Sequence, residues 1–386
     1  MRIRRFAVAL LGAALLVAAP ARASAPATPW SATWGTSQGL ALSVGPWQNE
    51  TLRMVARSSL AGTEVRVHLA NTFATSTAVF THVSIGVQQS GPDTWGAPVE
   101  LEFDGASSVT LAPGASTVSD PANLAVSANT RLIVSVYMPS GANIVSAPAH
   151  QLSQNVQYNY NGSDVTGSAS PVPFTNEFPF TSYVSSIDVG TVSASTIVAA
   201  GDSITDGTNG VADADTRWPD YLGARVASLG YGVVNAGIVG DQVTADTSGA
   251  PSLTSRWLRD VLSVAGVRTV VDAAGINDLR AGVSAAALES AQTTLIGQAH
   301  AAGVRVLLTT ITPCSGQSLC TSSFENARQA YNAWVRAGTS ADGFADFDAA
   351  VGNGASLATA YDSGDHIHPN AAGAELLAAA VNTALL

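Results

Sequence analysis

Lysine is absent from this chain of 386 residues, and all 17 basic residues are arginine. The absence excludes Schiff-base chemistry on a lysine and a lysine general base. Positive charge is scarce as well, because 28 acidic residues leave a formal net charge of −11 at pH 7. A surface of this sign repels phosphate backbones, so we expect no nucleic acid partner.

Long hydrophobic runs are lacking after the N-terminal segment. There, the apolar run 6–19 follows three arginines and precedes a small-x-small motif at 21–23, which is typical of an export signal cleaved after about Ala23. The run is short for a membrane span, so we expect no membrane insertion. The sequence thus predicts a signal peptide over 1–23 and a secreted protein. Export of the protein would follow the general or the twin-arginine route.

Cysteine is also rare, with Cys314 and Cys320 as the two examples. In an exported protein, two cysteines so close in the sequence favour a local disulfide. Closing such a short loop stabilises the fold by only about 2 kcal/mol when chain entropy alone is counted. A metal site on these cysteines would need further ligands nearby in the sequence, and none is found there.

The first half of the expected mature chain alternates between apolar and polar residues, which is the period of a β-strand. The segments 63–71 and 131–138 show this alternation, and Gly- and Pro-rich turns separate such segments. We predict an all-β sandwich or jelly-roll domain over 24–192. Its tryptophans could stack on sugar rings, although a place in the core is the commoner role for such residues: Trp30, Trp34, Trp47 and Trp95.

From residue 193 onward, short apolar strands alternate with helical patterns. This order predicts a five-stranded parallel sheet with helices on both faces, in a second domain over 193–386. Ser203 follows the end of the first strand, and sites in such sheets form at the carboxyl ends of strands. The predicted strands are 196–200, 232–235, 267–273, 304–311 and 344–347, and the predicted helices are 217–229, 252–263, 284–301, 323–337 and 371–385.

Ser203 ends a Gly-Asp-Ser segment, and these residue types are common in turns as well as at nucleophiles. A nucleophilic serine needs a base, usually histidine. Four of the six histidines lie in the predicted β domain or in the last turn of a helix, where a structural role is favoured: His68, His82, His150 and His300.

The remaining histidines, His366 and His368, lie in a loop before the last predicted helix, where Asn370 is the expected N-cap. Asp365 precedes His368 at a spacing that lets one turn place its carboxylate against Nδ1 and leaves Nε2 for Ser203. His366 is adjacent to Asp365 and cannot be held in this way. A metal site built from Asp365 and both imidazoles is the alternative, but it lacks a further ligand nearby, so we expect no metal.

Acyl transfer also needs donors for the oxyanion that develops in the transition state, each contributing roughly 3–4 kcal/mol when well placed. The segments after the second and third predicted strands offer two candidates. Gly240 lets its backbone N–H approach a substrate because it has no Cβ, and Asn277 can donate from its side-chain amide. Taken alone, each is also a common loop or turn residue.

Four short segments in this order resemble the SGNH/GDSL hydrolase superfamily: G-D-S at 201–203, V-G-D at 239–241, G-x-N-D at 275–278 and D-x-x-H at 365–368. The segments 215–222 and 256–262 are further similar to the acylhydrolase/arylesterase branch associated with xylan-degrading enzymes, which also carries an N-terminal β domain. The resemblance covers nearly all of the expected mature chain. It implies the SGNH hydrolase fold, a flavodoxin-like doubly wound five-stranded parallel sheet.

The resemblance also implies roles for individual residues, and no cofactor. Ser203 would be the nucleophile, His368 the general base and then the acid, and Asp365 the carboxylate that orients the imidazole. The oxyanion hole would consist of the N–H groups of Ser203 and Gly240 and the Asn277 side chain.

Two positions depart from the family pattern. Ile204 stands where leucine is usual, which affects packing rather than chemistry. Val239 stands where many members have a small residue, which would narrow the pocket. Asp202 and Asp278 lie inside the motifs, and we interpret both as structural residues of the turns.

These observations together predict a secreted serine esterase that hydrolyses short acyl esters, with acetyl groups on polysaccharide as the natural target. We recognise no long hydrophobic lid or acyl-binding stretch, which favours small acyl groups. The alternatives are a broader lipid or aryl-ester hydrolase, and a non-catalytic carbohydrate-binding protein with a hydrolase-like fold.

Overall fold

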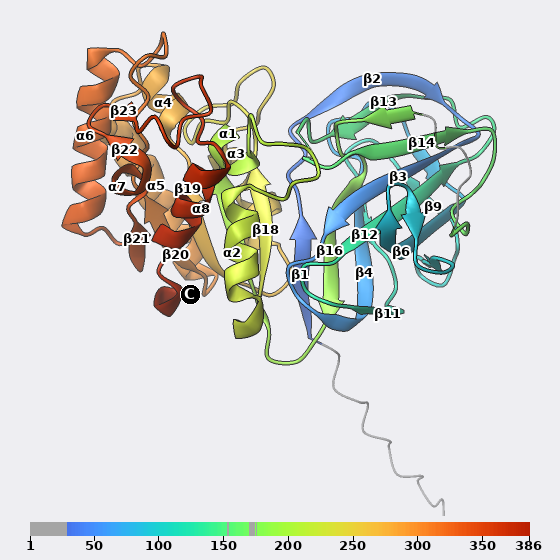
Figure 1. Cartoon of the computed structure of the whole chain (residues 1–386). Coiled ribbons are helices and arrows are strands. Elements are labelled where there is room, and N and C mark those ends of the chain that lie inside the picture. Colours follow the sequence, from blue (N-terminus) through green and yellow to red (C-terminus); the bar gives the residue numbers. More distant parts are fainter. Residues whose placement is uncertain (1–28, 153, 170–173, 175) are drawn as a thin grey trace, which may run out of the picture.

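The computed structural model describes residues 29–152, 154–169, 174 and 176–386, so the expected signal peptide lies outside the described residues. Two parts pack side by side: one is built of β-strands, and the other is a sheet covered by helices (Figure 1). Among the helices of the described ranges, none is long and apolar enough to cross a membrane.

Two antiparallel sheets form most of the N-terminal part. One has the order β1-β16-β4-β10, with β11 also paired to β4, and the other has the order β15-β14-β3-β12-β6-β7, with β8 also paired to β6. The strands of the first are β1 (Trp30–Gly35), β4 (Gly62–Ala70), β10 (Ser116–Val118), β11 (Ala122–Val126) and β16 (Val184–Gly190). Those of the second are β3 (Glu50–Arg57), β6 (His82–Ser90), β7 (Asp93–Thr94), β8 (Val99–Glu100), β12 (Arg131–Met138), β14 (Gln157–Asn161) and β15 (Asn176–Phe178).

Alternate side chains of the two sheets share one core. Val65 and Val67 of β4 are fully buried, and they belong to the same cluster as Leu52 of β3 and Val134 of β12. The predicted period-two pattern therefore reflects one face on the core, as in a sandwich. The all-β character of this region is confirmed. Two small pairs complete it: β2 (Leu40–Trp47) with β13 (Ile144–Ala149), and β5 (Ala78–Phe80) with β9 (Val109–Leu111).

The second part contains a five-stranded, wholly parallel sheet, as predicted. Its order is β18-β17-β19-β20-β21, so the first strand along the chain lies inside the sheet between the second and the third. The strands are β17 (Ser195–Gly201), β18 (Tyr231–Gly237), β19 (Val267–Ala273), β20 (Arg305–Thr309) and β21 (Gly343–Ala345). A short hairpin lies outside it, β22 (Gly352–Asn353) with β23 (Ser356–Leu357).

Helices cover both faces of this sheet. Neighbouring residues of β17 therefore point into two different hydrophobic cores. Val198 packs in the cluster that holds Leu295 of α5, and Ile197 packs in the one that holds Leu222 of α2. The helices are α1 (Ser203–Asp206), α2 (Trp218–Val226), α3 (Leu253–Trp257), α4 (Ile276–Arg280), α5 (Ala285–Ala301), α6 (Ser322–Ala337), α7 (Phe347–Val351) and α8 (Ala371–Ala380).

Three predicted helices are shorter than expected: two continue in another helical form, and the third is interrupted. The helix predicted over 217–229 closes with a 3₁₀ turn at Ala227–Leu229, and the one predicted over 371–385 is interrupted before a 3₁₀ turn at Thr383–Leu385. The helix predicted over 252–263 continues as a π-helical segment at Leu258–Leu262.

The two parts meet backbone to backbone along β1 and β18. Thr36 pairs in parallel with Asn235, and the Ala32 N–H donates to the Ala265 carbonyl at 3.0 Å. Gly232 shows how close the approach is, because an added Cβ there would lie 2.1 Å from the Ala32 carbonyl oxygen. The N-terminal β region is therefore packed onto the edge of the parallel sheet.

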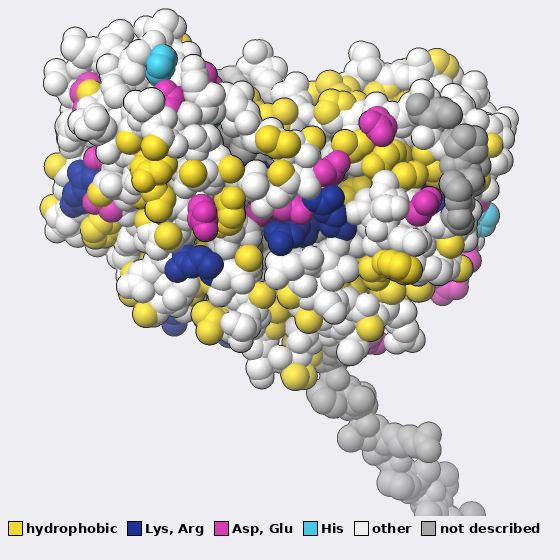
Figure 2. Space-filling model, in the orientation of Figure 1, with side chains coloured by type: hydrophobic (Ala, Val, Ile, Leu, Met, Phe, Trp, Pro, Cys, Tyr) yellow, Lys and Arg dark blue, Asp and Glu magenta, His cyan; other side chains and the backbone are white. Residues whose placement is uncertain are grey.

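Ion pairs join the same two parts at the surface. Arg131 binds Asp215 at 2.7 Å, and Arg57 lies 3.5 Å from the same carboxylate. Figure 2 shows basic and acidic side chains gathered together in the middle of the visible face, where the two parts meet.

Candidate active site

Ser203 lies at the carboxyl edge of the parallel sheet, in the short turn α1 that follows β17. Asp202 caps this turn, because its carboxylate accepts the Ile204 N–H at 3.0 Å. Gly207 ends it in the left-handed region at φ 99°, and its N–H donates to the Ser203 carbonyl at 2.9 Å. Only glycine adopts that conformation without strain. The Gly-Asp-Ser segment thus forms a turn and holds the serine in a fixed position.

The loop before α8 brings an imidazole to this serine. His368 Nε2 lies 2.8 Å from Ser203 Oγ, and His368 Nδ1 lies 2.5 Å from Asp365 Oδ2. The other oxygen of Asp365 accepts the backbone N–H groups of Ile367 at 3.1 Å and His368 at 2.9 Å. Asn370 caps α8 through the Gly373 N–H, as predicted. The three residues expected to form a triad are therefore brought together in the expected order.

The Asp365 carboxylate remains ionised at neutral pH. Burial works to raise its pKa, but the hydrogen bonds from His368 and Ile367 outweigh that effect and hold the pKa well below its ordinary value. Asn209, which the sequence did not single out, donates a further hydrogen bond from Nδ2 to Asp365 Oδ2 at 2.8 Å. A carboxylate in this state favours the Nδ1–H tautomer of His368 and leaves Nε2 as the acceptor for the serine hydroxyl.

The three expected oxyanion donors differ in their surroundings. Within the described residues, neither the Ser203 N–H nor the Gly240 N–H donates a hydrogen bond to the protein. Gly240 adopts a φ of 75°, and a Cβ there would meet nothing within 4 Å. Asn277 uses one amide hydrogen on the Asp241 carbonyl at 2.9 Å, and its oxygen accepts from Arg280. One amide hydrogen of Asn277 is thus left for a ligand.

Buried charged residues, which we call the ionic frame, hold these loops in place: Asp202, Asp241, Asp278 and Arg256. Asp278 accepts the N–H groups of Val243 at 2.7 Å and Thr244 at 3.0 Å, which ties α4 to the Gly240 loop. Asp202 is fully buried, and burial raises its pKa to about 7. Both aspartates are structural, as we interpreted them.

Arg256 belongs to this frame, and the sequence assigned it no role. Its guanidinium is fully buried and binds Asp241 Oδ2 through Nε at 3.0 Å. The same group donates to the carbonyls of Gly201 at 3.0 Å and Ala236 at 2.8 Å, at the ends of β17 and β18. Arg256 therefore fixes the edge of the sheet from which Ser203 projects.

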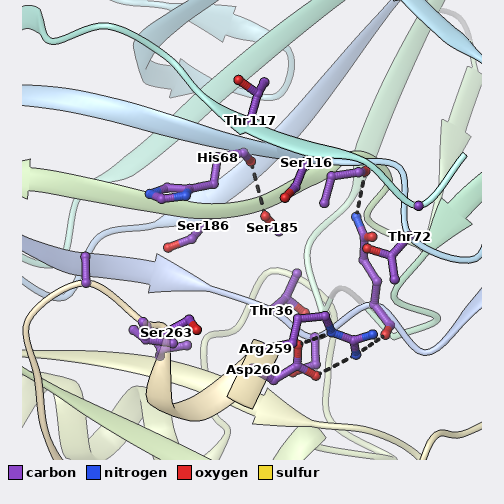
Figure 3. A pocket seen from close by; sticks show the side chains of 17 residues that line it. Thr36, His68, Thr72, Ser116, Thr117, Ser185, Ser186, Arg259, Asp260 and Ser263 are labelled. Atoms are coloured by element: carbon purple, nitrogen blue, oxygen red, sulfur yellow. Dashed lines mark hydrogen bonds and ion pairs between the residues drawn. The ribbon is translucent and has the colours of Figure 1, made fainter. Parts of the chain in front are cut away.

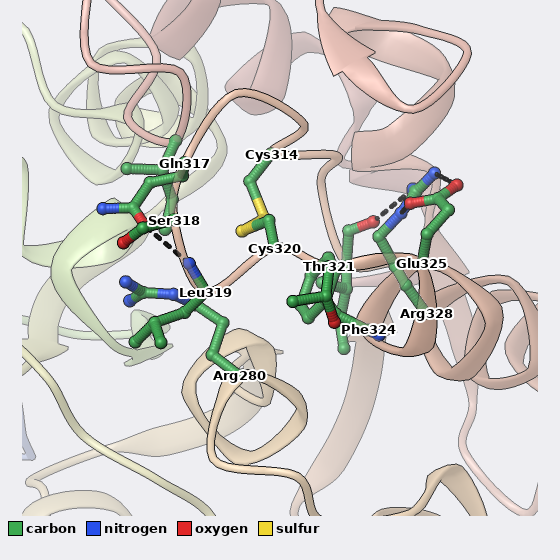
Figure 4. Close-up of a disulfide and its surroundings, with 12 residues drawn as sticks. Arg280, Cys314, Gln317, Ser318, Leu319, Cys320, Thr321, Phe324, Glu325 and Arg328 are labelled. Atoms are coloured by element: carbon green, nitrogen blue, oxygen red, sulfur yellow. Dashed lines mark hydrogen bonds and ion pairs between the residues drawn. A yellow bond between two sulfur atoms is a disulfide. The ribbon is translucent and has the colours of Figure 1, made fainter.

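His366 binds a different carboxylate from His368. Its Nδ1 lies 2.9 Å from Asp362 Oδ2, and more than half of the side chain is exposed. The ring packs on the disulfide loop, because a Cβ on Gly316 would lie 2.9 Å from it. The predicted disulfide is present between Cys314 and Cys320, with Cα atoms 5.8 Å apart (Figure 4).

Two of the cavities among the described residues are lined by none of the three residues. One of about 260 Å³ lies beside them, between Ile204, Asn209 and Pro369. Another, of about 410 Å³, lies where the two parts meet and is lined by hydroxyl groups together with His68 and Arg259 (Figure 3).

A parallel sheet whose carboxyl edge presents a hydrogen-bonded serine, histidine and aspartate defines the class of α/β serine hydrolases. Comparison with protein families agrees, because residues 199–376 match the GDSL-like Lipase/Acylhydrolase family. The chain therefore carries a domain of that family and is an ester hydrolase of the serine class. Comparison with curated proteins gives no match.

Solved structures are similar over about half of this chain. The inhibitor-bound aryl esterase from M. smegmatis is 18% identical with a TM-score of 0.40, over 48% of this chain and 95% of that one. A GDSL-like lipase from Bacteroides thetaiotaomicron is 21% identical with a TM-score of 0.39, over 49% and 87%. An acetyl xylan esterase from Geobacillus stearothermophilus is 22% identical with a TM-score of 0.37, over 48% and 92%.

Proposed function

We propose that this protein is an exported serine esterase that removes short acyl groups, acetyl above all, from polysaccharide. Ser203 is the nucleophile, His368 the general base and then the acid, and Asp365 the orienting carboxylate. The observation that carries the proposal is the continuous contact from Asp365 through the imidazole to the Ser203 hydroxyl, at 2.5 and 2.8 Å. Export is supported by the leader-like pattern at 1–23 and by the disulfide.

The reaction follows from this geometry. Ser203 Oγ attacks the ester carbonyl carbon while His368 Nε2 takes the hydroxyl proton, and Asp365 stabilises the imidazolium that forms. The tetrahedral intermediate then collapses, the C–O bond to the alcohol breaks, and His368 returns the proton to the leaving oxygen. Water attacks the acyl-enzyme with the imidazole again as base, which releases the carboxylic acid and restores the serine hydroxyl.

The oxyanion of the intermediate needs donors that are not already used by the protein. The N–H groups of Ser203 and Gly240 and the second amide hydrogen of Asn277 meet this need. Asn277 is held in place through its own oxygen by Arg280 and through its other hydrogen by the Asp241 carbonyl, at 3.0 and 2.9 Å. A donor that is fixed before the reaction needs no reorganisation when the charge develops.

The preference for a small acyl group on a hydroxyl-rich alcohol is supported by the residues around the triad. Asn209 and Ser363 contact Asp365, and Asp362 and His366 lie in the same loop. These polar side chains can exchange hydrogen bonds with sugar hydroxyls, and the apolar surface near them is that of the adjacent cavity of about 260 Å³, which Ile204, Val211, Pro369 and Leu377 help to line. Val239, before Gly240, would narrow the space for the acyl group further.

Hydrolysis of p-nitrophenyl acetate, butyrate and octanoate, together with acetate release from acetylated xylan, tests the proposal. We expect the acetate ester to have the highest kcat/KM, xylan to be deacetylated, and Ser203→Ala to lose at least about 10³-fold in kcat. Equal rates for Ser203→Ala and the wild-type protein would overturn the triad assignment. An octanoate preference without acetate release from xylan would overturn the substrate class.

A further inference from the structure

A buried histidine from the N-terminal β part contacts the turn that carries the nucleophile. His150, directly after β13, lies with Nε2 at 2.9 Å from Oδ1 of Asp206, the last residue of α1. The two side chains are 4% and 1% exposed, so water does not screen the pair. Neither residue has a part in the mechanism proposed above.

The ring of His150 is surrounded by acceptors. Nδ1 lies 2.9 Å from the Ser37 carbonyl, and Nε2 lies 3.0 Å from the Leu152 carbonyl as well as near Asp206. A neutral imidazole carries a lone pair on one nitrogen, which would here point at a carbonyl or carboxylate oxygen. Only the imidazolium, with a proton on each nitrogen, satisfies both sides. The contact with Asp206 is therefore a buried ion pair.

Asp206 connects this ion pair to Ser203. Its N–H donates to the Asp202 carbonyl at 2.9 Å, which closes the turn α1 around the nucleophile. The next part of the same loop is also bound by the N-terminal part, because Gln154 Nε2 donates to the Gly207 carbonyl at 2.6 Å. The N-terminal β part thus contacts the segment that carries Ser203 at two successive residues, Asp206 and Gly207.

We propose that His150 is a positioning residue for the nucleophile: as an imidazolium it holds Asp206, and with it the turn α1, so that the Ser203 hydroxyl faces His368. The N-terminal β part thereby completes the active site instead of only accompanying it. The inference rests on the proposed role of Ser203.

The support that His150 gives to α1 depends on pH, because it requires the charged imidazolium. Burial lowers the pKa of His150, and the nearby positive charge of Arg217 lowers it further. Attraction to Asp206 and the hydrogen bonds from Nε2 and Nδ1 raise the pKa by more, so it stays above its ordinary value. A raised folded-state pKa means that the ion pair persists to a higher pH than an ordinary histidine would allow and is lost as the pH rises through that pKa. Deprotonation then leaves a lone pair facing an acceptor, so α1 loses its support on the alkaline side.

His150→Gln is the primary test, because glutamine can still donate to Asp206 but does not titrate. We measure the pre-steady-state acylation rate, kcat and KM for p-nitrophenyl acetate between about pH 6 and pH 10, together with the thermal midpoint. The expected result is an acylation rate about 10-fold lower at pH 7, consistent with a small displacement of the serine. KM is expected to change little, and the alkaline limb of the wild-type profile is expected to disappear.

The matched control is His68→Gln. His68 Nε2 lies 2.7 Å from Oδ2 of the buried Asp188, but both residues belong to the N-terminal part. This variant alters a similar His–Asp contact in the same way and is expected to keep the wild-type acylation rate and pH profile. If His150→Gln lowers the thermal midpoint but likewise keeps both, its role is only structural and the inference is overturned.

Asp206→Asn keeps the inference testable if His150→Gln does not fold. Asparagine keeps an acceptor for the imidazole but removes the negative charge, so the alkaline limb of the acylation rate is expected to move to lower pH. An unmoved limb contradicts the inference. The proposed function fails separately, through Ser203→Ala with undiminished hydrolysis, whereas this inference fails through variants whose hydrolysis still depends on Ser203.

Discussion

His368 Nε2 lies 2.8 Å from Ser203 Oγ, although the two residues are 165 positions apart in the sequence. The parallel sheet explains how they meet. Ser203 leaves the carboxyl end of β17 inside the sheet, and the loop before α8 returns the chain to the same edge. This contact forms only when the whole domain is folded. It also identifies residues whose substitution should change the activity measurably.

Asn277→Ala should lower kcat by about 10²–10³-fold, because it removes an oxyanion donor. The variant also loses the hydrogen bond to the Asp241 carbonyl, so we expect the free energy of unfolding to fall by roughly 1 kcal/mol. Steady-state kinetics and urea unfolding measure the two effects. A change confined to KM would contradict the assigned role.

His368→Ala should abolish the burst of p-nitrophenol that reports acyl-enzyme formation, because the serine then has no base. His366→Ala is the matched control in the same loop, since this histidine binds Asp362 and not the serine. We expect the control to keep the burst. The reverse pattern in stopped-flow traces would mean that the other imidazole is the base.

Asn209→Gly should lower kcat by up to about 10-fold, because Asp365 loses a charge-assisted hydrogen bond that helps to fix His368. Asn209 has a φ of 65°, so glycine removes the amide without adding backbone strain, whereas Asn209→Ala adds strain as well. Equal kcat values for Asn209→Gly and the wild-type protein would show that the contact does not matter for catalysis.

Asp202→Asn should stabilise the protein at pH 8 but change it little near pH 4. The folded-state pKa of Asp202 is raised to about 7 by burial, so the folded protein binds this proton more tightly than the unfolded chain. Stability is therefore greatest below the unfolded-state pKa of about 3.9 and falls as the pH rises towards 7. Asparagine can keep the cap on Ile204 without a buried charge.

The gain at pH 8 should be on the order of 2–4 kcal/mol. Urea unfolding of both proteins at the two pH values measures it. The prediction fails if the difference in the free energy of unfolding is the same at both. The activity of the variant is a separate matter, because Asp202 precedes the nucleophile.

Much of the local structure could be predicted because it depends on neighbouring residues. The helix predicted over 284–301 is α5, and Asn370 caps α8 as expected. The contact between Asp365 and His368 also lies within one turn, where backbone geometry limits the possible distances. The endings of α2 and α3 were missed, because a helix and its 3₁₀ or π continuation share nearly the same apolar period. The end of α8 was missed as well, because Val381, which leaves the helical conformation there, is as apolar as the helix residues before it.

Three contacts around the candidate site escaped prediction because the partners are distant in the sequence. His150 binds Asp206, Arg256 binds the ends of two strands, and Asn209 binds Asp365. The sequence marks none of these pairs, since a lone histidine, arginine or asparagine is usually structural. Arg256 lies in a segment that resembles the acylhydrolase branch, and this was the one available signal.

The amino-acid sequence by itself determined which chemistry this protein can perform: it offers a serine after a strand, a histidine with its carboxylate in one turn, and no lysine. These properties depend on residue type and on spacings of a few residues, which hydrogen bonds within a turn control. Only the tertiary structure decided that the β region reaches the catalytic turn through His150 and Asp206. Such a contact depends on how two sheets pack against each other, and this packing leaves no periodic pattern in the sequence.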